Sequence, residues 1–270
     1  MLEVHDARKT FNPQAPNAVF ALRGVTLAVE PGSLVCIIGT NGSGKSTLLN
    51  AIAGTFLLDS GRICLDGRDV THCREHERAA FIGRVFQDPF SGTAAGMTVA
   101  ENLVLAVRRG QRRGLRRALN RRMRQQIKGR LRRLNLGLED RLDDPIGTLS
   151  GGQRQALTLL MATWVKPRLL LLDEHTAALD PKSAGQVTAL SKEAIERDGL
   201  TALMVTHSMQ QAVQLGDRLI MMHQGRVIRD YRGEDKQRIR QADLLEIFEM
   251  VRRIDQLDET AAEMLARNYV

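Results

Sequence analysis

Short runs of apolar residues alternate along the chain with longer stretches in which polar and apolar residues mix. The runs at 33–38, 168–173, 201–206 and 218–223 have the length and composition of buried strands. The segment 45–53 follows the first run and has the composition of a helix. Strands that alternate with helices are typical of a largely parallel sheet. We therefore predict an α/β fold.

Other parts of the pattern indicate smaller elements. Asp66-Gly67 and Gln224-Gly225 are typical two-residue hairpin turns, so antiparallel β pieces should accompany the parallel sheet. Strand patterns are missing between about Thr98 and Asn135, which predicts a helical insert within a helical subdomain at about 90–160. We expect one domain over residues 1–240.

Residues 241–270 are predicted to form a C-terminal helical tail of one amphipathic helix or two. Packing of its apolar face against the core is favoured over a contact in a dimer. The apolar residues recur at spacings of three and four: Leu244, Phe248, Val251, Ile254, Leu257, Ala261 and Met264.

Positive charge is concentrated in one region. The net charge is +8, yet residues 102–138 contain no Asp or Glu. Without the basic residues of that stretch, the rest of the chain has 26 basic and 31 acidic residues, a balance of −5. A regional basic patch indicates an anionic neighbour, such as phosphate groups, lipid headgroups or an acidic partner. The patch consists of Lys128 and Arg108, Arg109, Arg112, Arg113, Arg116, Arg117, Arg121, Arg122, Arg124, Arg130, Arg132 and Arg133.

The remaining composition excludes several classes of protein. The three cysteines form no CxxC pair, which favours a reduced, intracellular chain over a disulfide scaffold. The start MLEVHDARKT lacks the features of a signal peptide, and no apolar run approaches the ~20 residues that span a bilayer. A metal site from Cys64, Cys73, His72 and His76 is the weaker reading, since the spacing fits no standard zinc pattern.

Residues 39–46, GTNGSGKS, match the pattern G-x-x-x-x-G-K-[ST], and we call them the phosphate loop. They follow a predicted strand and open a predicted helix, which is the context that this pattern requires. Backbone N–H groups would surround the phosphates, the Lys45 ammonium would reach them, and the Ser46 hydroxyl would ligate Mg²⁺. The pattern thus predicts a P-loop NTPase core that binds a nucleoside triphosphate with Mg²⁺. The contacting residues would be Gly39, Asn41, Gly42, Ser43, Gly44, Lys45, Ser46 and Thr47.

The run LLLLDE at 169–174 predicts a buried strand with two carboxylates at its C-terminal end, at the edge of the sheet. Open parallel sheets bind ligands at that edge. Asp173 is predicted to hold the Mg²⁺ ion, and Glu174 to orient and polarise the attacking water. Together with the phosphate loop, the two acids predict a site of nucleotide hydrolysis.

Residues 149–153 read LSGGQ, and we call them the LSGGQ segment. Ser150 is a good helix N-cap, and a helix N-terminus with glycines beside it attracts anions. With the phosphate loop and LLLLDE, this segment makes the chain resemble the ATP-binding subunits of ABC transporters, from near residue 1 to about Arg229. The resemblance implies that two subunits pair head to tail, with ATP between the phosphate loop of one and the partner's Ser150, Gly151, Gly152 and Gln153.

The resemblance implies roles for further residues. Gln87 would touch the Mg²⁺ and water site, Asp180 would lie in the loop that crosses between the two ATP sites, and His207 would contact the γ-phosphate. Phe11 would stack on adenine, with Phe20 as the competing candidate. Lys45, Gln87, Glu174 and His207 would form the catalytic set, and Ser46, Gln87 and Asp173 the metal set.

One position departs from the family pattern. His175 follows the catalytic glutamate where the family usually has Pro, and the alternative reading is that it only tolerates a turn. The phrases DEHTAALDPK, GRVFQDP and MTVAENL resemble uncharacterised importer ATPases grouped with tryptophan- or tyrosine-type substrate-binding proteins.

The resemblance implies a transport ATPase, an importer more than an exporter, at the cytoplasmic face of the membrane. Its partners would be separate transmembrane permease subunits, a second copy of the chain and a separate substrate-binding protein. The rival class is an ABC ATPase that acts on nucleic acid. The basic stretch is nearly free of aromatic residues, so no specific nucleic-acid partner is expected. A noncatalytic regulatory subunit is disfavoured because Lys45, Asp173, Glu174 and His207 are all present. We expect Arg108–Arg133 to help dock the chain at the bilayer or permease, with a solvated helix face as the alternative.

Overall fold

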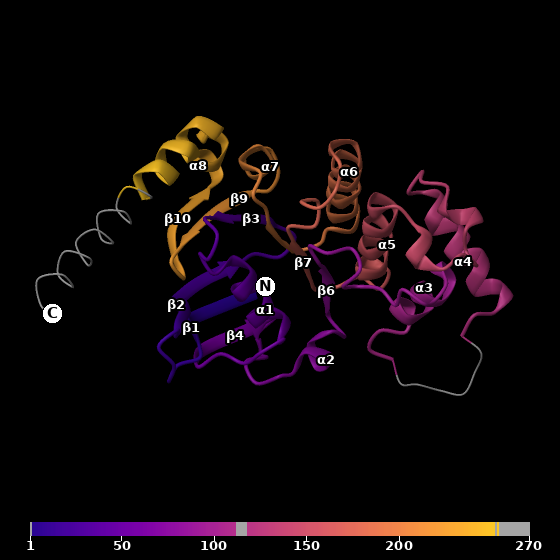
Figure 1. Ribbon diagram of the computed structural model, residues 1–270, viewed down its shortest axis with the longest axis horizontal. Coiled ribbons are helices and arrows are strands. Elements are labelled where there is room, and N and C mark those ends of the chain that lie inside the picture. The colour runs from indigo at the N-terminus through magenta and orange to yellow at the C-terminus, as the bar shows by residue number, and fades with distance from the viewer. Residues whose placement is uncertain (1, 112–117, 252, 254–270) are drawn as a thin grey trace, which may run out of the picture.

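The computed structural model describes residues 2–111, 118–251 and 253, and a central sheet runs through its middle (Figure 1). Its strands are β3 (Leu34–Gly39), β6 (Ile82–Val85), β7 (Leu169–Asp173), β8 (Ala202–Val205), β9 (Arg218–His223) and β10 (Arg226–Arg232). Their order is β10-β9-β3-β8-β7-β6. All neighbours are parallel except β9 and β10. The four strands predicted from apolar runs are therefore confirmed within a residue at either end.

A second, antiparallel sheet has the order β2-β1-β4-β5, with β1 (Leu2–Phe11), β2 (Val19–Val29), β4 (Ser60–Leu65) and β5 (Arg68–Asp69). Both predicted hairpin turns are confirmed. Asp66 and Gly67 have φ of 51° and 76°, and Gln224 and Gly225 have φ of 42° and 75°. Positive φ at both central residues is the turn geometry that matches the twist of paired strands.

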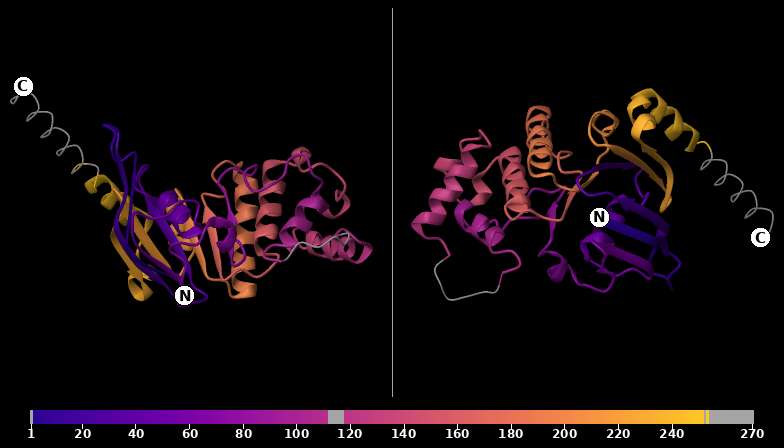
Figure 2. Two further views of the ribbon diagram at one scale, coloured as in Figure 1. Left: turned by 90° about the horizontal axis from the view of Figure 1, so that it is seen from below. Right: turned by 180° about the vertical axis from the view of Figure 1, so that it is seen from behind.

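The helices are α1 (Lys45–Ala53), α2 (Glu75–Arg78), α3 (Val99–Val107), α4 (Arg121–Arg132), α5 (Gly151–Thr163), α6 (Pro181–Asp198), α7 (Met209–Gln214) and α8 (Gly233–Arg238), followed by helical residues 241–251. The antiparallel sheet and α1 lie on one side of the central sheet, and α6 and α7 on the other (Figure 1). Helices α3 and α4 lie at the end of the molecule opposite the antiparallel sheet (Figure 2). The predicted helix at 45–53 is confirmed, and α3 and α4 lie within the predicted helical insert.

The central strands are buried on both faces. In β3, Val35 and Ile37 join the core beneath the antiparallel sheet, whereas Cys36 and Ile38 join the core beneath α5, α6 and α7. Strands β7 and β8 alternate in the same way. Period-two alternation between two apolar environments explains why these strands read as continuous apolar runs.

Part of the basic stretch is used for internal contacts. The Arg109 guanidinium donates to the Ala162 and Val165 carbonyls at 3.0 and 2.7 Å, near the end of α5. The Arg130 guanidinium donates to the Trp164 carbonyl at 2.9 Å and lies 4.1 Å from the centre of the Trp164 ring. Cations at a helix C-terminus satisfy its last carbonyls and oppose its dipole. Four of the arginines on which the docking prediction depends, Arg112, Arg113, Arg116 and Arg117, lie outside the described residues.

The C-terminal helical residues pack on the second core. Leu244 and Phe248 are 0% and 9% exposed in the cluster that contains Cys36 and Ile38. This placement agrees with the packing reading of the tail for residues 241–251. The predicted apolar positions Ile254, Leu257, Ala261 and Met264 lie outside the described residues. Among the helices that are described, none is both long and apolar enough to cross a membrane.

Arg78 joins α2 to the end of α1 and is 1% exposed. Its guanidinium donates to the carbonyls of Ala51, Ile52, Thr71 and Cys73 at 2.8 to 3.0 Å.

We expect Arg78→Met to lower the free energy of unfolding by about 3 kcal/mol, because several buried carbonyls lose their donors. Urea denaturation followed by circular dichroism would measure the loss. Arg121→Met, on an exposed face of α4, is the matched control, and an equal stability for the two variants would contradict this role.

Candidate functional site

The phosphate loop joins the end of β3 to the start of α1, and its glycines are required by close contacts. Gly42 and Gly44 have φ of 77° and 94°, which side chains rarely adopt. A Cβ atom on Gly39 would lie 2.3 Å from the Met222 carbonyl oxygen, and one on Gly44 would lie 2.4 Å from the Ala21 carbonyl oxygen. The loop therefore holds its shape only with glycine at these positions.

The first turn of α1 is suited to a phosphate. Gly44 is the N-cap and supplies no side-chain hydrogen bond, and no acidic residue lies in the first turn. Backbone N–H groups at such a helix start favour an anion. The Lys45 ammonium, 5% exposed, donates to the Gly39 and Thr40 carbonyls, both at 2.9 Å. Burial lowers the pKa of Lys45, and the carboxylates of Glu174 and Asp173 oppose that shift.

Two oxygen ligands that suit Mg²⁺ lie at the end of the phosphate loop, one from the loop itself and one from β7. The Ser46 hydroxyl donates to Asp173 Oδ1 at 3.1 Å, and Asp173 is the last residue of β7. Hydroxyl and carboxylate oxygens are the hard ligands that Mg²⁺ prefers, so these residues fit the ion. Gln87, the third predicted ligand, is exposed just after β6.

Arg84 on β6 lies beside Asp173 and was not predicted from the sequence to be near the site. Its guanidinium nitrogen lies 3.7 Å from Asp173 Oδ2 and 2.5 Å from Asn50 Oδ1. Burial lowers the pKa of Arg84, opposed first by Asp173. Its position three residues before Gln87 carried no signal, because only the pairing of β6 with β7 brings it to the carboxylate.

Glu174 and His207 lie together at the edge of the central sheet. Glu174 Oε1 is 2.5 Å from His207 Nε2, and the Glu174 side chain is 8% exposed. Glu174 has a φ of 45°, unusual for a residue with a side chain. Its backbone N–H donates to the Val205 carbonyl at 3.0 Å, and its carbonyl accepts from the Ala177 N–H at 2.9 Å. A buried carboxylate held this way can accept a proton from a water beside the phosphate loop.

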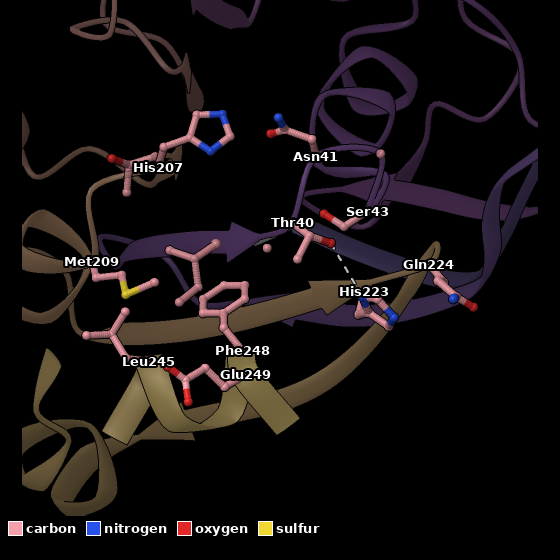
Figure 3. Close-up of a pocket in the computed structure, with 14 residues that line it drawn as sticks. Thr40, Asn41, Ser43, His207, Met209, His223, Gln224, Leu245, Phe248 and Glu249 are labelled. Atoms are coloured by element: carbon pink, nitrogen blue, oxygen red, sulfur yellow. Dashed lines mark hydrogen bonds between the residues drawn. The ribbon is translucent and has the colours of Figure 1, made fainter. Parts of the chain in front are cut away.

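A cavity of about 610 Å³ opens beside the loop (Figure 3). Asn41 and Ser43 line it from the loop, and His207 points toward Asn41 across it. Leu245 and Phe248 line the opposite side from residues 241–251. The tail was not expected near the site, because helical periodicity does not reveal which surface a helix covers.

The LSGGQ segment lies with Asp180 in a second cluster, on other elements. Ser150 is the N-cap of α5, and Ser150 and Gln153 exchange backbone-to-side-chain hydrogen bonds of 3.2 Å. Asp180 is the N-cap of α6 and accepts from two backbone N–H groups at 3.1 Å. A Cβ atom on Gly152 would lie 2.7 Å from Ser183 Cβ, so the starts of α5 and α6 are in contact.

The two candidates for adenine stacking lie on neighbouring strands. The Phe11 ring packs edge-on against Phe56, with centroids 5.3 Å apart, and is 36% exposed. Phe20 is 57% exposed, and the Arg23 guanidinium lies 5.5 Å from its ring centre. Both rings present surface that a base could cover.

The structure also gives the surroundings of the cysteines and of His175. Within the described part of the chain, no group of three or more His, Cys, Asp or Glu side chains could hold a metal ion, and the three cysteines are free. His175 is 3% exposed, and burial lowers its pKa to about 4.

Comparisons with known proteins agree with this geometry. The family model described as ABC transporter matches residues 22–177. A tyrosine transport ATP-binding protein of Clostridioides difficile is 43% identical over 92% of this chain and 99% of its own length. A methionine import ATP-binding protein of Rhizobium johnstonii is 33% identical over 85% of this chain and 60% of its own length. A solved dimeric ATP-binding cassette in a post-hydrolysis state with ADP and Pi has a TM-score of 0.74 at 29% identity, over 86% of this chain and 98% of that one. The chain therefore belongs to the ABC transporter family, as an ATP-binding domain with ATPase activity that uses ATP and Mg²⁺.

Proposed function

We propose that two copies of this chain pair head to tail and hydrolyse ATP to drive import through separate transmembrane permease subunits. The main support for this proposal is that the predicted site residues lie in two separate clusters of one chain. Lys45, Ser46, Asp173, Glu174 and His207 gather at the phosphate loop, whereas the LSGGQ segment and Asp180 form a separate cluster at the starts of α5 and α6. A second copy that presents its LSGGQ segment to the phosphate loop would supply further N–H donors to the nucleotide. The dimeric relatives support this arrangement.

The proposed chemistry is positioning and electrostatic stabilisation. Lys45, the loop N–H groups and His207 hold the transferred phosphate, and Glu174 aligns the attacking water. Ser46 and Asp173 would hold Mg²⁺, with Gln87 as the third proposed ligand, and the ion would supply positive charge to the phosphates. Asp180 and Ser150 to Gln153 act on the partner's site.

The names of the relatives support the proposed direction of transport and the proposed partners. Several are named as import proteins, and the relative that is 43% identical is named for tyrosine transport. We place the chain at the cytoplasmic face of the membrane, with a separate substrate-binding protein that delivers a small amino-acid-type substrate.

The test is to co-express the tagged chain with candidate transmembrane permeases of the same organism and to reconstitute the purified complex in lipid vesicles. We expect both chains to copurify, and substrate uptake to require ATP and the cognate binding protein. Recovery of the chain away from membranes, with salt-sensitive RNA binding, would instead favour the nucleic-acid class and overturn the proposal.

Phe11 should contribute to nucleotide affinity through stacking on adenine. We expect Phe11→Ala to raise the dissociation constant for ATP about tenfold, since base–aromatic stacking contributes about 1–3 kcal/mol. Fluorescence titration with a labelled ATP analogue measures this. Phe20→Ala is the matched variant, and a larger effect there would assign the stacking role to Phe20.

A further inference from the structure

His175 lies directly after Glu174 in the chain and is anchored to α6. Its Nε2 atom is 2.9 Å from the Ser191 hydroxyl oxygen, and Ser191 is fully buried. The Ser191 hydroxyl donates to the Val187 carbonyl at 2.8 Å. Because the only hydroxyl proton is used there, His175 must be the donor in its bond to Ser191. The chain of bonds His175–Ser191–Val187 therefore has a defined direction and ends on the backbone of α6.

This anchor holds a strained turn. The left-handed φ of 45° at Glu174 costs about 1–3 kcal/mol, which the neighbouring contacts must offset. The Glu174 N–H donates to the Val205 carbonyl of β8 and ties the turn to the sheet, and the Ala177 N–H donates to the Glu174 carbonyl within the turn. The His175 side chain adds a third anchor on the helix side, one residue from the Glu174 carboxylate.

The helix that receives this anchor also carries the second cluster. Helix α6 begins at the N-cap Asp180, and its Ser183 contacts Gly152 in the LSGGQ segment. A displacement of α6 would therefore move Ser191 as well. The His175–Ser191 bond is a direct side-chain link between the turn of Glu174 and the element that the proposed dimer presents to the partner's site.

We propose that His175 is a positioning residue, which fixes Glu174 for water activation by its hydrogen bond to Ser191 and ties that turn to α6. The inference rests on the proposed role of Glu174 as the base. It requires that the bond to Ser191, and not the mere presence of a ring, determines the turnover rate.

The test compares His175→Phe, His175→Gln and Ser191→Ala in the full-length chain. Phe keeps a ring but cannot donate, whereas Gln places an N–H at the same distance along the side chain. We expect His175→Phe and Ser191→Ala to lower kcat about tenfold or more with KM for ATP unchanged, because small displacements of a catalytic group are costly. His175→Gln should keep most of the native rate. The double variant His175→Phe with Ser191→Ala should be no slower than either of its single variants, because both substitutions remove the same bond. Binding of a fluorescent ATP analogue without Mg²⁺ should be unchanged throughout.

Thr163→Val is the matched control, because the Thr163 hydroxyl makes the same kind of bond, to the Leu159 carbonyl four residues earlier, in buried α5. Rates are measured well below the melting temperature of every variant. If kcat in His175→Phe and Ser191→Ala stays at the native value, or falls only as much as in Thr163→Val, the positioning role is overturned. Glu174→Gln is measured alongside, since native turnover in that variant would instead overturn the proposed role of Glu174 as the base.

Discussion

Glu174→Gln should lower ATP turnover by about 1,000-fold while ATP binding remains at the native level. General-base contributions are typically 10²–10⁴-fold, and the amide of Gln cannot accept the proton of the attacking water. The substitution keeps the shape of a side chain that is 8% exposed and lies 2.5 Å from His207, so the fold and the phosphate loop should be preserved. Phosphate release in the steady state and binding of a fluorescent ATP analogue measure the two effects.

The same variant tests the proposed dimer. Without hydrolysis, ATP should hold two subunits together, so Glu174→Gln should run as a dimer on size exclusion with ATP and Mg²⁺ and as a monomer without them. Glu193→Gln on an exposed part of α6 is the matched control and should hydrolyse ATP normally. Unchanged hydrolysis in Glu174→Gln would remove Glu174 from the catalytic set.

The parallel core was predictable because its signals are local. Strands buried on both faces, such as β3 and β7, appear as apolar runs, and the glycines of the phosphate loop mark backbone shapes that side chains exclude. Strands β1 and β2 were not identified, since bulges between Val4 and Ala7 and between Lys9 and Thr10 interrupt the alternation. The distribution of charge along the sequence predicted docking arginines only in part. It cannot distinguish Arg109, which donates to a carbonyl of α5, from an arginine whose side chain is available for docking.

The motifs predicted the residue types of the candidate site, and its geometry was predictable only in part. Ser46 lies beside Asp173 and His207 beside Glu174, and the roles predicted for these residues remain proposals. Arg84 lies beside Asp173, and Leu245 lines the cavity across from the phosphate loop. Both placements arise from contacts between distant elements, for which a single sequence holds no local signal. His175 was noticed only as a departure, and its bond to Ser191 sixteen residues later required the structure.

Lys45→Met should weaken ATP binding about 100-fold, which also removes hydrolysis at moderate ATP concentrations. A hydrogen bond to a charged group contributes about 1.5–3 kcal/mol, and the ammonium would make more than one with the phosphates. The Met side chain has similar length and suits a position that is 5% exposed, so unfolding should not account for the loss. The expected effect is large because the phosphate loop holds the ammonium in place. Lys45 Nζ donates to the Gly39 and Thr40 carbonyls of the loop. Isothermal titration with ATP measures the affinity, and Lys192→Met on exposed α6 controls for the loss of one positive charge. Equal affinities for the two variants would mean that the backbone of the phosphate loop alone binds the nucleotide.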